Sequence, residues 1–184
     1  MYVRVPGGPG CTARVAAVAA AGGAVEVPVR RTHDGALVCA EAPYGPGDPL
    51  ADVLAAGRGR VLLDVPNVPG EPDFDAPRCE TARLVAALRP DPATVTAVTN
   101  DWYACPLLRD AGLRVAFRPP RGVAMDAAVA YASDNGIEAL APHPSDVTDE
   151  GLAAARERGV AVVQTTTDSE SGTDLNVSRS TSPR

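Results

Sequence analysis

A regular alternation of short apolar segments with alanine-rich helical segments is the feature that most constrains the fold of this chain. The apolar, strand-like segments begin near residues 2, 24, 60, 94, 113, 137 and 160. Units of about 20 to 36 residues are typical of a parallel sheet in which a helix follows each strand. Seven such units in one domain favour a compact α/β fold, a parallel (βα)8 TIM-type barrel, over an open doubly wound sheet, although the periodicity fits both.

The apolar composition supports closely packed layers. Alanine (33 residues) and valine (23 residues) supply most of the apolar side chains, while aromatic residues make up 4% of the chain. Such small side chains let helices pack closely on a sheet of buried, valine-rich strands. The glycines of VPGGPG, after the first predicted strand, lack the spacing of a dinucleotide- or phosphate-binding loop, which argues against a nucleotide-binding sheet.

The length of 184 residues predicts one domain with a short extension. We assign residues 1–168 to the barrel domain. Residues 169–184 are rich in serine and threonine and have no helical pattern, so we predict a short closing segment and a flexible tail there. Within them, TDLNVSR (residues 173–179) is the candidate for a degenerate eighth unit, a closing strand without its helix.

The charge and hydropathy of the chain exclude several classes of partner. All 17 basic residues are arginine and the net charge is −6. Such a surface offers no basic face to nucleic acid, and it resembles the acidic surface of proteins from salt-adapted organisms. No apolar run reaches about 18 residues, and no signal-peptide pattern is present, so we predict a cytoplasmic protein without a membrane span. The oligomeric state stays open.

The four cysteines predict neither a zinc site nor a disulfide. Cys11, Cys39, Cys79 and Cys105 are scattered along the chain and form no C-x-x-C pair. This pattern is typical of reduced, mostly buried thiols in a cytoplasmic protein.

One segment, GGAVEVPVRRTHDGALVCAEAP (residues 22–43), is similar to the signature of glycerophosphodiester phosphodiesterases. In that family an alanine-rich helix leads to Glu-x-Asp-Val, then to Thr-x-Asp-Gly, and then to a hydrophobic run that ends in His-Asp. Glu26 and Val29 match the first motif, and Thr32, Asp34 and Gly35 match the second. Later segments resemble the family in the same order, so that the resemblance covers residues 1–168.

The resemblance implies a TIM barrel that hydrolyses phosphodiesters in lipid and glycerol metabolism. In the family, carboxylates at the strand ends hold a divalent cation, two histidines transfer protons, and an arginine and a lysine neutralise the phosphate. Most of these residues are replaced here. Val5 and Ala40 stand in place of the histidines, Pro6 and Pro66 in place of the arginine and the lysine, and Pro28 in place of an aspartate ligand.

Three carboxylates remain at or beside the family's metal positions. Glu26 matches the first glutamate ligand, Asp64 takes the place of the third ligand, and Glu41 follows the lost second histidine. We expect them to bind Mg²⁺ or Ca²⁺ weakly, because too few ligands are left for a hard cation. The alternative interpretation is that Glu26 and Asp64 are structural carboxylates and that Glu41 is a solvated loop residue.

Other polar residues follow predicted strands at the functional face of the barrel. His143 is the candidate catalytic residue, and Arg118 and Arg121 are candidates for binding a phosphate. The plainer alternatives are a rigid loop histidine and solvated loop arginines. We interpret His33 as an exposed turn residue and Trp102 as a packing residue near the rim.

Two hypotheses of different classes follow for the function. The first is a catalytically degenerate family member, a pseudoenzyme that binds a small anionic or polyol ligand or a protein partner. The second is an active phosphoric diester hydrolase with a metal site rebuilt from Glu26, Glu41, Asp64 and His143. Whether these four side chains converge within about 5 Å of one metal position distinguishes them.

Overall fold

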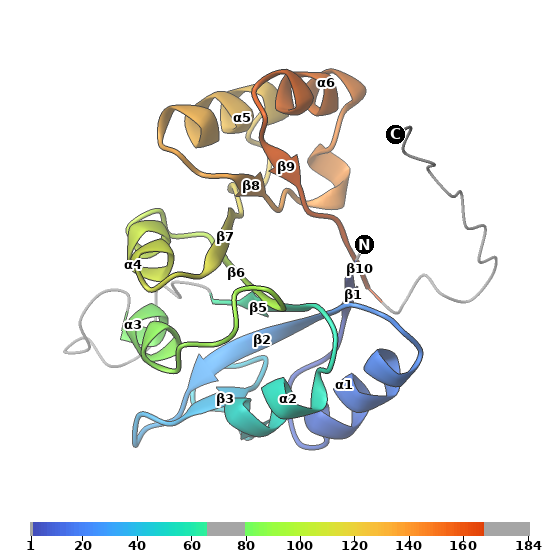
Figure 1. The fold of residues 1–184 in the computed structure, drawn as a ribbon, viewed down its shortest axis with the longest axis vertical. Helices are drawn as coiled ribbons and strands as arrows, with labels where there is room; N and C mark the ends of the chain where they lie inside the picture. The colour runs from blue at the N-terminus through green and yellow to red at the C-terminus, as the bar shows by residue number, and fades with distance from the viewer. Residues whose placement is uncertain (1, 66–79, 168–184) are drawn as a thin grey trace.

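Residues 2–65 and 80–167 are described by a computed structural model, which forms a mixed α/β fold (Figure 1). The hydrogen-bonded order of the parallel strands is β10-β1-β2-β5-β6-β7-β8-β9. The bounds of these strands are Tyr2–Arg4 (β1), Val25–Arg31 (β2), Val61–Asp64 (β5), Val95–Thr99 (β6), Arg114–Phe117 (β7), Ala139–Leu140 (β8), Ala161–Val162 (β9) and Thr165–Thr167 (β10). The predicted α/β class with parallel strands is therefore confirmed.

The first and last strands of this order lie in one segment of chain. Two residues, Val163 and Gln164, separate β9 from β10. The backbone nitrogen of Val163 donates to the oxygen of Leu140 at 2.7 Å, and the nitrogen of Tyr2 donates to the oxygen of Gln164 at 3.0 Å. The segment 161–167 thus pairs with β8 at its start and with β1 at its end. The predicted closing strand at residues 173–179 lies outside the described residues.

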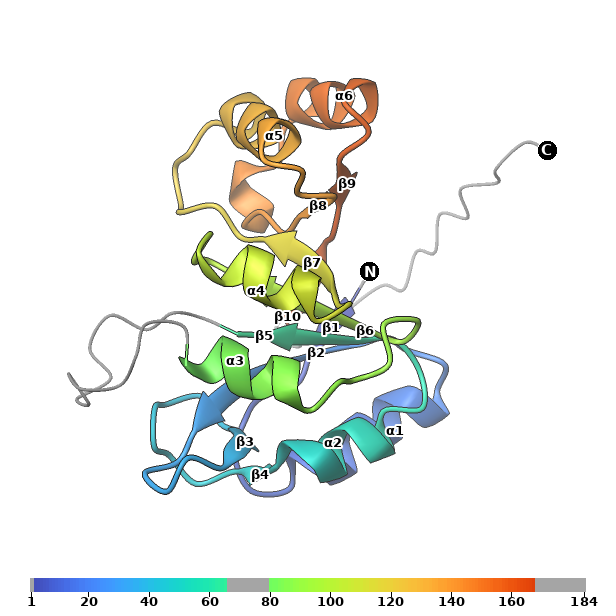
Figure 2. The same cartoon turned by 60° about the vertical axis from the view of Figure 1, so that its left-hand side comes forward.

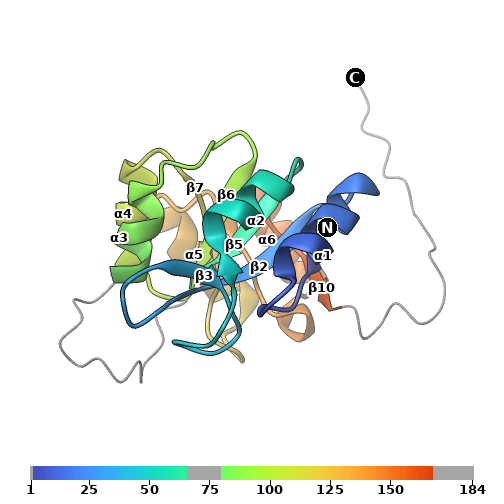
Figure 3. The ribbon, with the colours of Figure 1, turned by 90° about the horizontal axis from the view of Figure 1, so that it is seen from below.

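In the described part of the chain, six α-helices connect the strands and pack in neighbouring pairs. Figure 3 shows α1 beside α2 and α3 beside α4, and Figure 2 shows α5 beside α6. Their bounds are Cys11–Ala20 (α1), Leu50–Ala56 (α2), Glu80–Ala87 (α3), Ala104–Asp110 (α4), Met125–Asp134 (α5) and Asp149–Glu157 (α6). Thr148 caps α6, because its hydroxyl accepts a hydrogen bond from the nitrogen of Gly151. Within the described residues, no helix has the length and apolarity to cross a membrane.

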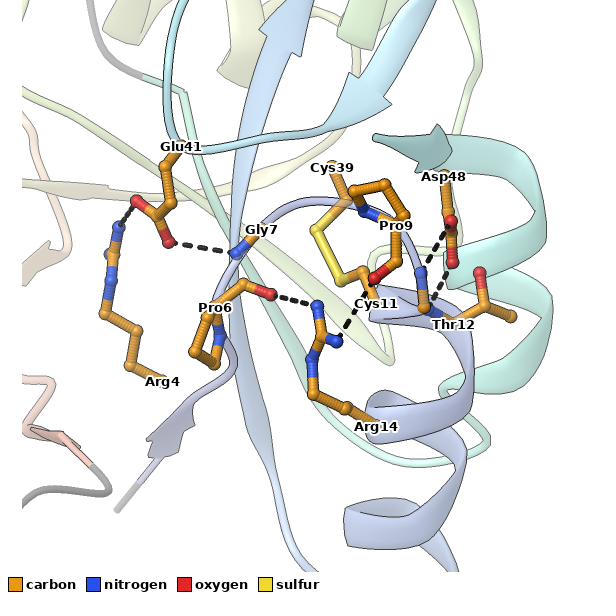
Figure 4. Close-up of a disulfide and its surroundings, with 11 residues drawn as sticks. Arg4, Pro6, Gly7, Pro9, Cys11, Thr12, Arg14, Cys39, Glu41 and Asp48 are labelled. Carbon is orange, nitrogen blue, oxygen red and sulfur yellow. Dashed lines mark hydrogen bonds and ion pairs between the residues drawn. A yellow bond between two sulfur atoms is a disulfide. The ribbon is translucent and has the colours of Figure 1, made fainter. Parts of the chain in front are cut away.

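A small antiparallel hairpin follows β2 and brings two distant cysteines together. β3 (Leu37–Cys39) runs back along β2 and pairs with β4 (Asp48–Pro49). Cys39 then lies beside Cys11, the first residue of α1, and the two buried residues form a disulfide (Figure 4). The prediction of reduced thiols is therefore wrong for this pair. It holds for Cys105, which keeps a buried thiol, while Cys79 lies outside the described residues.

The two faces of the sheet carry different side chains. Alternate residues such as Val27 and Leu63 pack against helices α1 to α4 in the main core. Residues of the opposite parity, among them Leu62, Val98 and Ala116, form a separate small cluster contributed by several strands. We call the face of this second cluster the inner face. The charged residues described next lie on this inner face.

Candidate functional site

Four charged side chains from neighbouring parts of the sheet meet on the inner face. Arg4 ends β1, Glu26 lies in β2, Asp64 ends β5, and Arg118 directly follows β7. Strand residues two apart share a face. Arg4 therefore follows Tyr2, Asp64 follows Leu62 and Arg118 follows Ala116 on the inner face.

The four side chains form a closed ring of ion pairs. Arg4 Nη1 donates to Glu26 Oε1 at 2.8 Å and to Asp64 Oδ2 at 3.2 Å. Arg118 Nη2 donates to Glu26 Oε1 at 2.9 Å, and its Nη1 donates to Asp64 Oδ1 at 2.9 Å. Each carboxylate is thus held by both arginines, and each arginine by both carboxylates. We call this set the arginine–carboxylate ring.

Burial makes these pairings necessary. The side chain of Glu26 is 1% exposed, whereas those of Arg4 and Arg118 are 26% and 27% exposed. A carboxylate removed from water is costly unless cations and hydrogen-bond donors replace the solvent. Even so, Glu26 Oε2 is buried without a hydrogen-bond partner among the described residues.

Glu41 extends the ring on the side of Arg4 (Figure 4). Its Oε2 accepts from Arg4 Nη2 at 3.1 Å and its Oε1 accepts from the nitrogen of Gly7 at 2.9 Å. Burial would raise the pKa of Glu41, but the bond from Gly7 and the charge of Arg4 outweigh burial and lower it. Burial would likewise lower the pKa of Arg4, but the charges of Glu26, Asp64 and Glu41 prevail and raise it.

The donor set does not fit the divalent cation that the family resemblance implies. Glu26, Asp64 and Glu41 do converge, but they converge on the guanidinium group of Arg4. Within the described ranges, no group of three or more His, Cys, Asp or Glu side chains is placed to hold a metal ion. Two arginine cations thus occupy the charge-balancing role that a metal would have beside these carboxylates.

His143 lies apart from the ring and contacts Arg121 instead. Its Nε2 is 2.7 Å from Arg121 Nη2, and its Nδ1 is 2.8 Å from the hydroxyl of Ser145. Arginine can only donate, so Nε2 accepts and Nδ1 carries the proton. The backbone nitrogen of Ser145, 3.3 Å from Nδ1, does not fit this tautomer as a donor. His143 thus contacts Arg121 and Ser145 and no member of the arginine–carboxylate ring.

Arg4 is the site residue that sequence reasoning missed. The resemblance directs attention to the residues after Arg4, where Val5 and Pro6 stand in place of a histidine and an arginine. The signal that could have found Arg4 is the alternation of side chains along the first strand. Val3 and Val5 share one face of that strand, so Arg4 lies on the other face. In the structure Arg4 pairs in register with Glu26 on the neighbouring strand.

Comparisons with solved structures identify the fold. A protein of Silicibacter pomeroyi assigned as a glycerophosphoryl diester phosphodiesterase matches with a TM-score of 0.66 and 18% identity, over 90% of this chain and 82% of that one. A Galdieria sulphuraria protein assigned as a glycerophosphodiester phosphodiesterase matches with a TM-score of 0.67 and 10% identity, over 90% and 84%. A glycerophosphodiester phosphodiesterase from Parabacteroides distasonis matches with a TM-score of 0.56 and 15% identity, over 91% and 92%.

Neither a comparison with models of protein families nor a search of curated sequences finds a match. The resemblance seen in the sequence is therefore confirmed at the level of the fold, which these phosphodiesterase structures share with this chain.

Proposed function

We propose that this chain is a catalytically degenerate barrel of the glycerophosphodiester phosphodiesterase type that binds a small anionic ligand at the arginine–carboxylate ring. The observation that supports this proposal is the double pairing of Glu26 and of Asp64 with Arg4 and Arg118. Carboxylates engaged in this way balance guanidinium charges. They are not open ligands for a catalytic cation.

Neither of the two described positions that match the family's histidines holds a proton-transfer group. Val5 and Ala40, where the resemblance expects the two histidines, are buried apolar residues. General acid–base catalysis contributes typically about 10² to 10⁴ in rate for each group. Pro28, in register with Asp64, has no side-chain oxygen with which to bind a metal. A fold can persist after the loss of its original site, because scaffold and site are specified by different residues.

The ring leaves guanidinium donors directed to solvent. Arg118 gives two N–H groups to the ring, and about a quarter of its side chain remains exposed, 27%. A guanidinium carries five donors in a planar fork that suits carboxylate and phosphate groups. The ring itself is neutral, since two arginines face two carboxylates. We therefore expect weak binding of an anion at the exposed part of Arg118.

The test combines a binding measurement with an activity assay. Glycerol 3-phosphate is titrated into the wild type, Arg118→Gln and Arg156→Gln, the last removing an exposed arginine from the end of α6. We expect Arg118→Gln to abolish the binding and Arg156→Gln to preserve it. Equal affinity in all three proteins would refute the role of the ring.

The assay offers glycerophosphocholine and a chromogenic phosphodiester, with Mg²⁺, Ca²⁺ and Mn²⁺ added in turn. We expect no turnover above background. Metal-dependent turnover that disappears in Glu26→Gln would instead support the second hypothesis, an active hydrolase with a rebuilt site. No observation on the described residues favours that hypothesis at present, because His143 contacts Arg121 rather than the ring.

The role in lipid metabolism and the cytoplasmic location remain predictions. The disulfide between Cys11 and Cys39 argues against the second of these, because disulfides persist mainly in oxidising compartments.

A further inference from the structure

A second feature of the carboxyl face is an apolar pocket outside the arginine–carboxylate ring. It has a volume of about 460 Å³ and lies between the loop after β6, the loop after β7 and the first turns of α5. On β7, Arg118 faces the ring while its neighbour Phe117 lines the pocket. The two features therefore lie on opposite sides of one strand.

Three aromatic side chains from three elements form one wall of the pocket. Trp102 and Phe117 lie nearly parallel, with an interplanar angle of 15° and a centroid distance of 6.4 Å. The ring centroid of Tyr131, from α5, lies 4.7 Å from that of Trp102 and 5.7 Å from that of Phe117. Offset and tilted contacts of this kind stabilise aromatic clusters and hold the ring planes in place.

The loop that carries Trp102 is fixed by backbone hydrogen bonds. The nitrogen of Asp101 donates to the hydroxyl of Thr99 at 3.1 Å, and the carboxylate of Asp101 accepts from the nitrogen of Tyr103 at 2.9 Å. Despite this fixed position, Trp102 is 49% exposed. Trp102 therefore packs against Phe117 and Tyr131, as expected for a packing residue near the rim, but much of its indole also remains exposed to solvent.

The chemistry of the lining selects among ligand classes. None of the described residues that line the pocket is basic, so an anionic group has no partner there. The polar residues among them are Asn100, Asp101 and Tyr131, and the rest of the lining is aromatic, proline, valine and alanine. Pockets of about 300 to 1,000 Å³ with such a lining are typical of small-molecule sites.

We propose that this pocket binds a neutral, planar aromatic ligand, or the aromatic part of a larger one. Such a ligand stacks on the exposed side of Trp102 and covers apolar surface that is otherwise open to water. The small side chains of Ala127 and Ala128 on α5 leave the space that it fills. The proposal does not depend on anion binding at the arginine–carboxylate ring, because it uses no residue of the ring.

The experiment uses the neutral probe N-phenyl-1-naphthylamine and the full chain. Trp102 is the single tryptophan, so its fluorescence reports directly on the pocket. Ala127→Phe places a phenyl group in the pocket from an exposed position of α5. Ala16→Phe, the matched control, adds the same phenyl group at an exposed position of α1. Ala127→Glu, a second variant, places a charge at the same position without adding a ring.

We expect saturable binding by the wild type with quenching of Trp102. Ala127→Phe and Ala127→Glu should each weaken it by roughly tenfold or more, because the probe loses its apolar contact surface. Ala16→Phe should bind as the wild type does. Circular dichroism identifies a variant that fails to fold. If one Ala127 variant fails to fold, the affinity of the other tests the proposal. Absence of saturable binding, or unchanged affinity in a folded Ala127 variant, would overturn the proposal.

Discussion

Arg4 and Arg118 supply the positive charge that balances Glu26 and Asp64. Each donates to both Glu26 and Asp64. Removing one arginine leaves each carboxylate with a single cation, and removing both leaves two buried negative charges. We therefore expect the arginines to control how closely a metal ion can approach the two carboxylates.

The first prediction tests this at the scale of single residues. Replacing both arginines, Arg4→Gln with Arg118→Gln, should raise the affinity for Ca²⁺ by at least roughly tenfold, because two nearby positive charges no longer repel the ion. The wild type should bind Ca²⁺ only weakly. Isothermal titration calorimetry measures both affinities. Arg83→Gln with Arg156→Gln changes the net charge equally from exposed positions on α3 and α6. If this control gained as much affinity, the effect would be one of net charge and not of the ring.

A second residue-scale prediction concerns Glu41. Its pKa in the folded chain lies below the ordinary value of 4.5, so its ion pair stabilises the fold above that pH and is lost as the pH falls through the folded pKa. Glu41→Gln should therefore be less stable than the wild type at pH 7. Because half of the side chain is exposed, 49%, the difference should stay below about 1 kcal/mol.

Urea denaturation between pH 7 and pH 3 measures the Glu41 effect. The difference between wild type and Glu41→Gln should shrink as the solution becomes acidic. Glu138→Gln removes the same charge from an exposed position and serves as the reference. A difference that grew on acidification would contradict the assigned ion pair with Arg4.

Among the elements, the strand and helix pattern could be predicted from the sequence, but the hairpin contacts could not. Periodicity reports which side of a strand is apolar, and it located β2, β5, β6 and β7 near their observed positions. The pairing of Cys11 with Cys39 depends instead on the antiparallel register of β3, in which Cys39 lies opposite Val29. The register of β3 cannot be predicted from the spacing of the cysteines in the sequence.

The third prediction concerns the disulfide that joins α1 to β3. Its cysteines are 28 residues apart, and a cross-link that closes such a loop removes conformational entropy from the unfolded chain. Cys11→Ser with Cys39→Ser should lower the free energy of unfolding by about 3.5 kcal/mol on the loop-entropy estimate. Urea denaturation of the oxidised protein and of the double variant measures this. A reducing agent should destabilise the wild type and leave the variant unchanged, and a wild type insensitive to reductant would refute the prediction.

On the scale of the whole molecule, the fold class could be predicted from the sequence more fully than the arginine–carboxylate ring. The alternation of strands and helices predicted the α/β fold because every unit repeats it, so that local errors do not change the class. Sequence reasoning named three of the four members of the arginine–carboxylate ring as candidates, Glu26, Asp64 and Arg118, and missed Arg4. A ring needs its members placed across four strands, and that placement is a property of the assembled sheet.

The last prediction follows from the net charge of −6, with no lysine among the 17 basic residues. Exposed acidic side chains repel one another at low ionic strength, and salt screens that repulsion over a Debye length of about 10 Å at 0.1 M. Buried ion pairs such as those of Glu26 are screened much less, so the repulsive surface dominates the response to salt. The melting temperature should therefore rise from dilute buffer to molar potassium chloride. Glu138→Gln with Glu157→Gln removes two exposed acids and should reduce the slope. A flat or falling curve in the wild type would show that surface repulsion does not limit the stability of this fold.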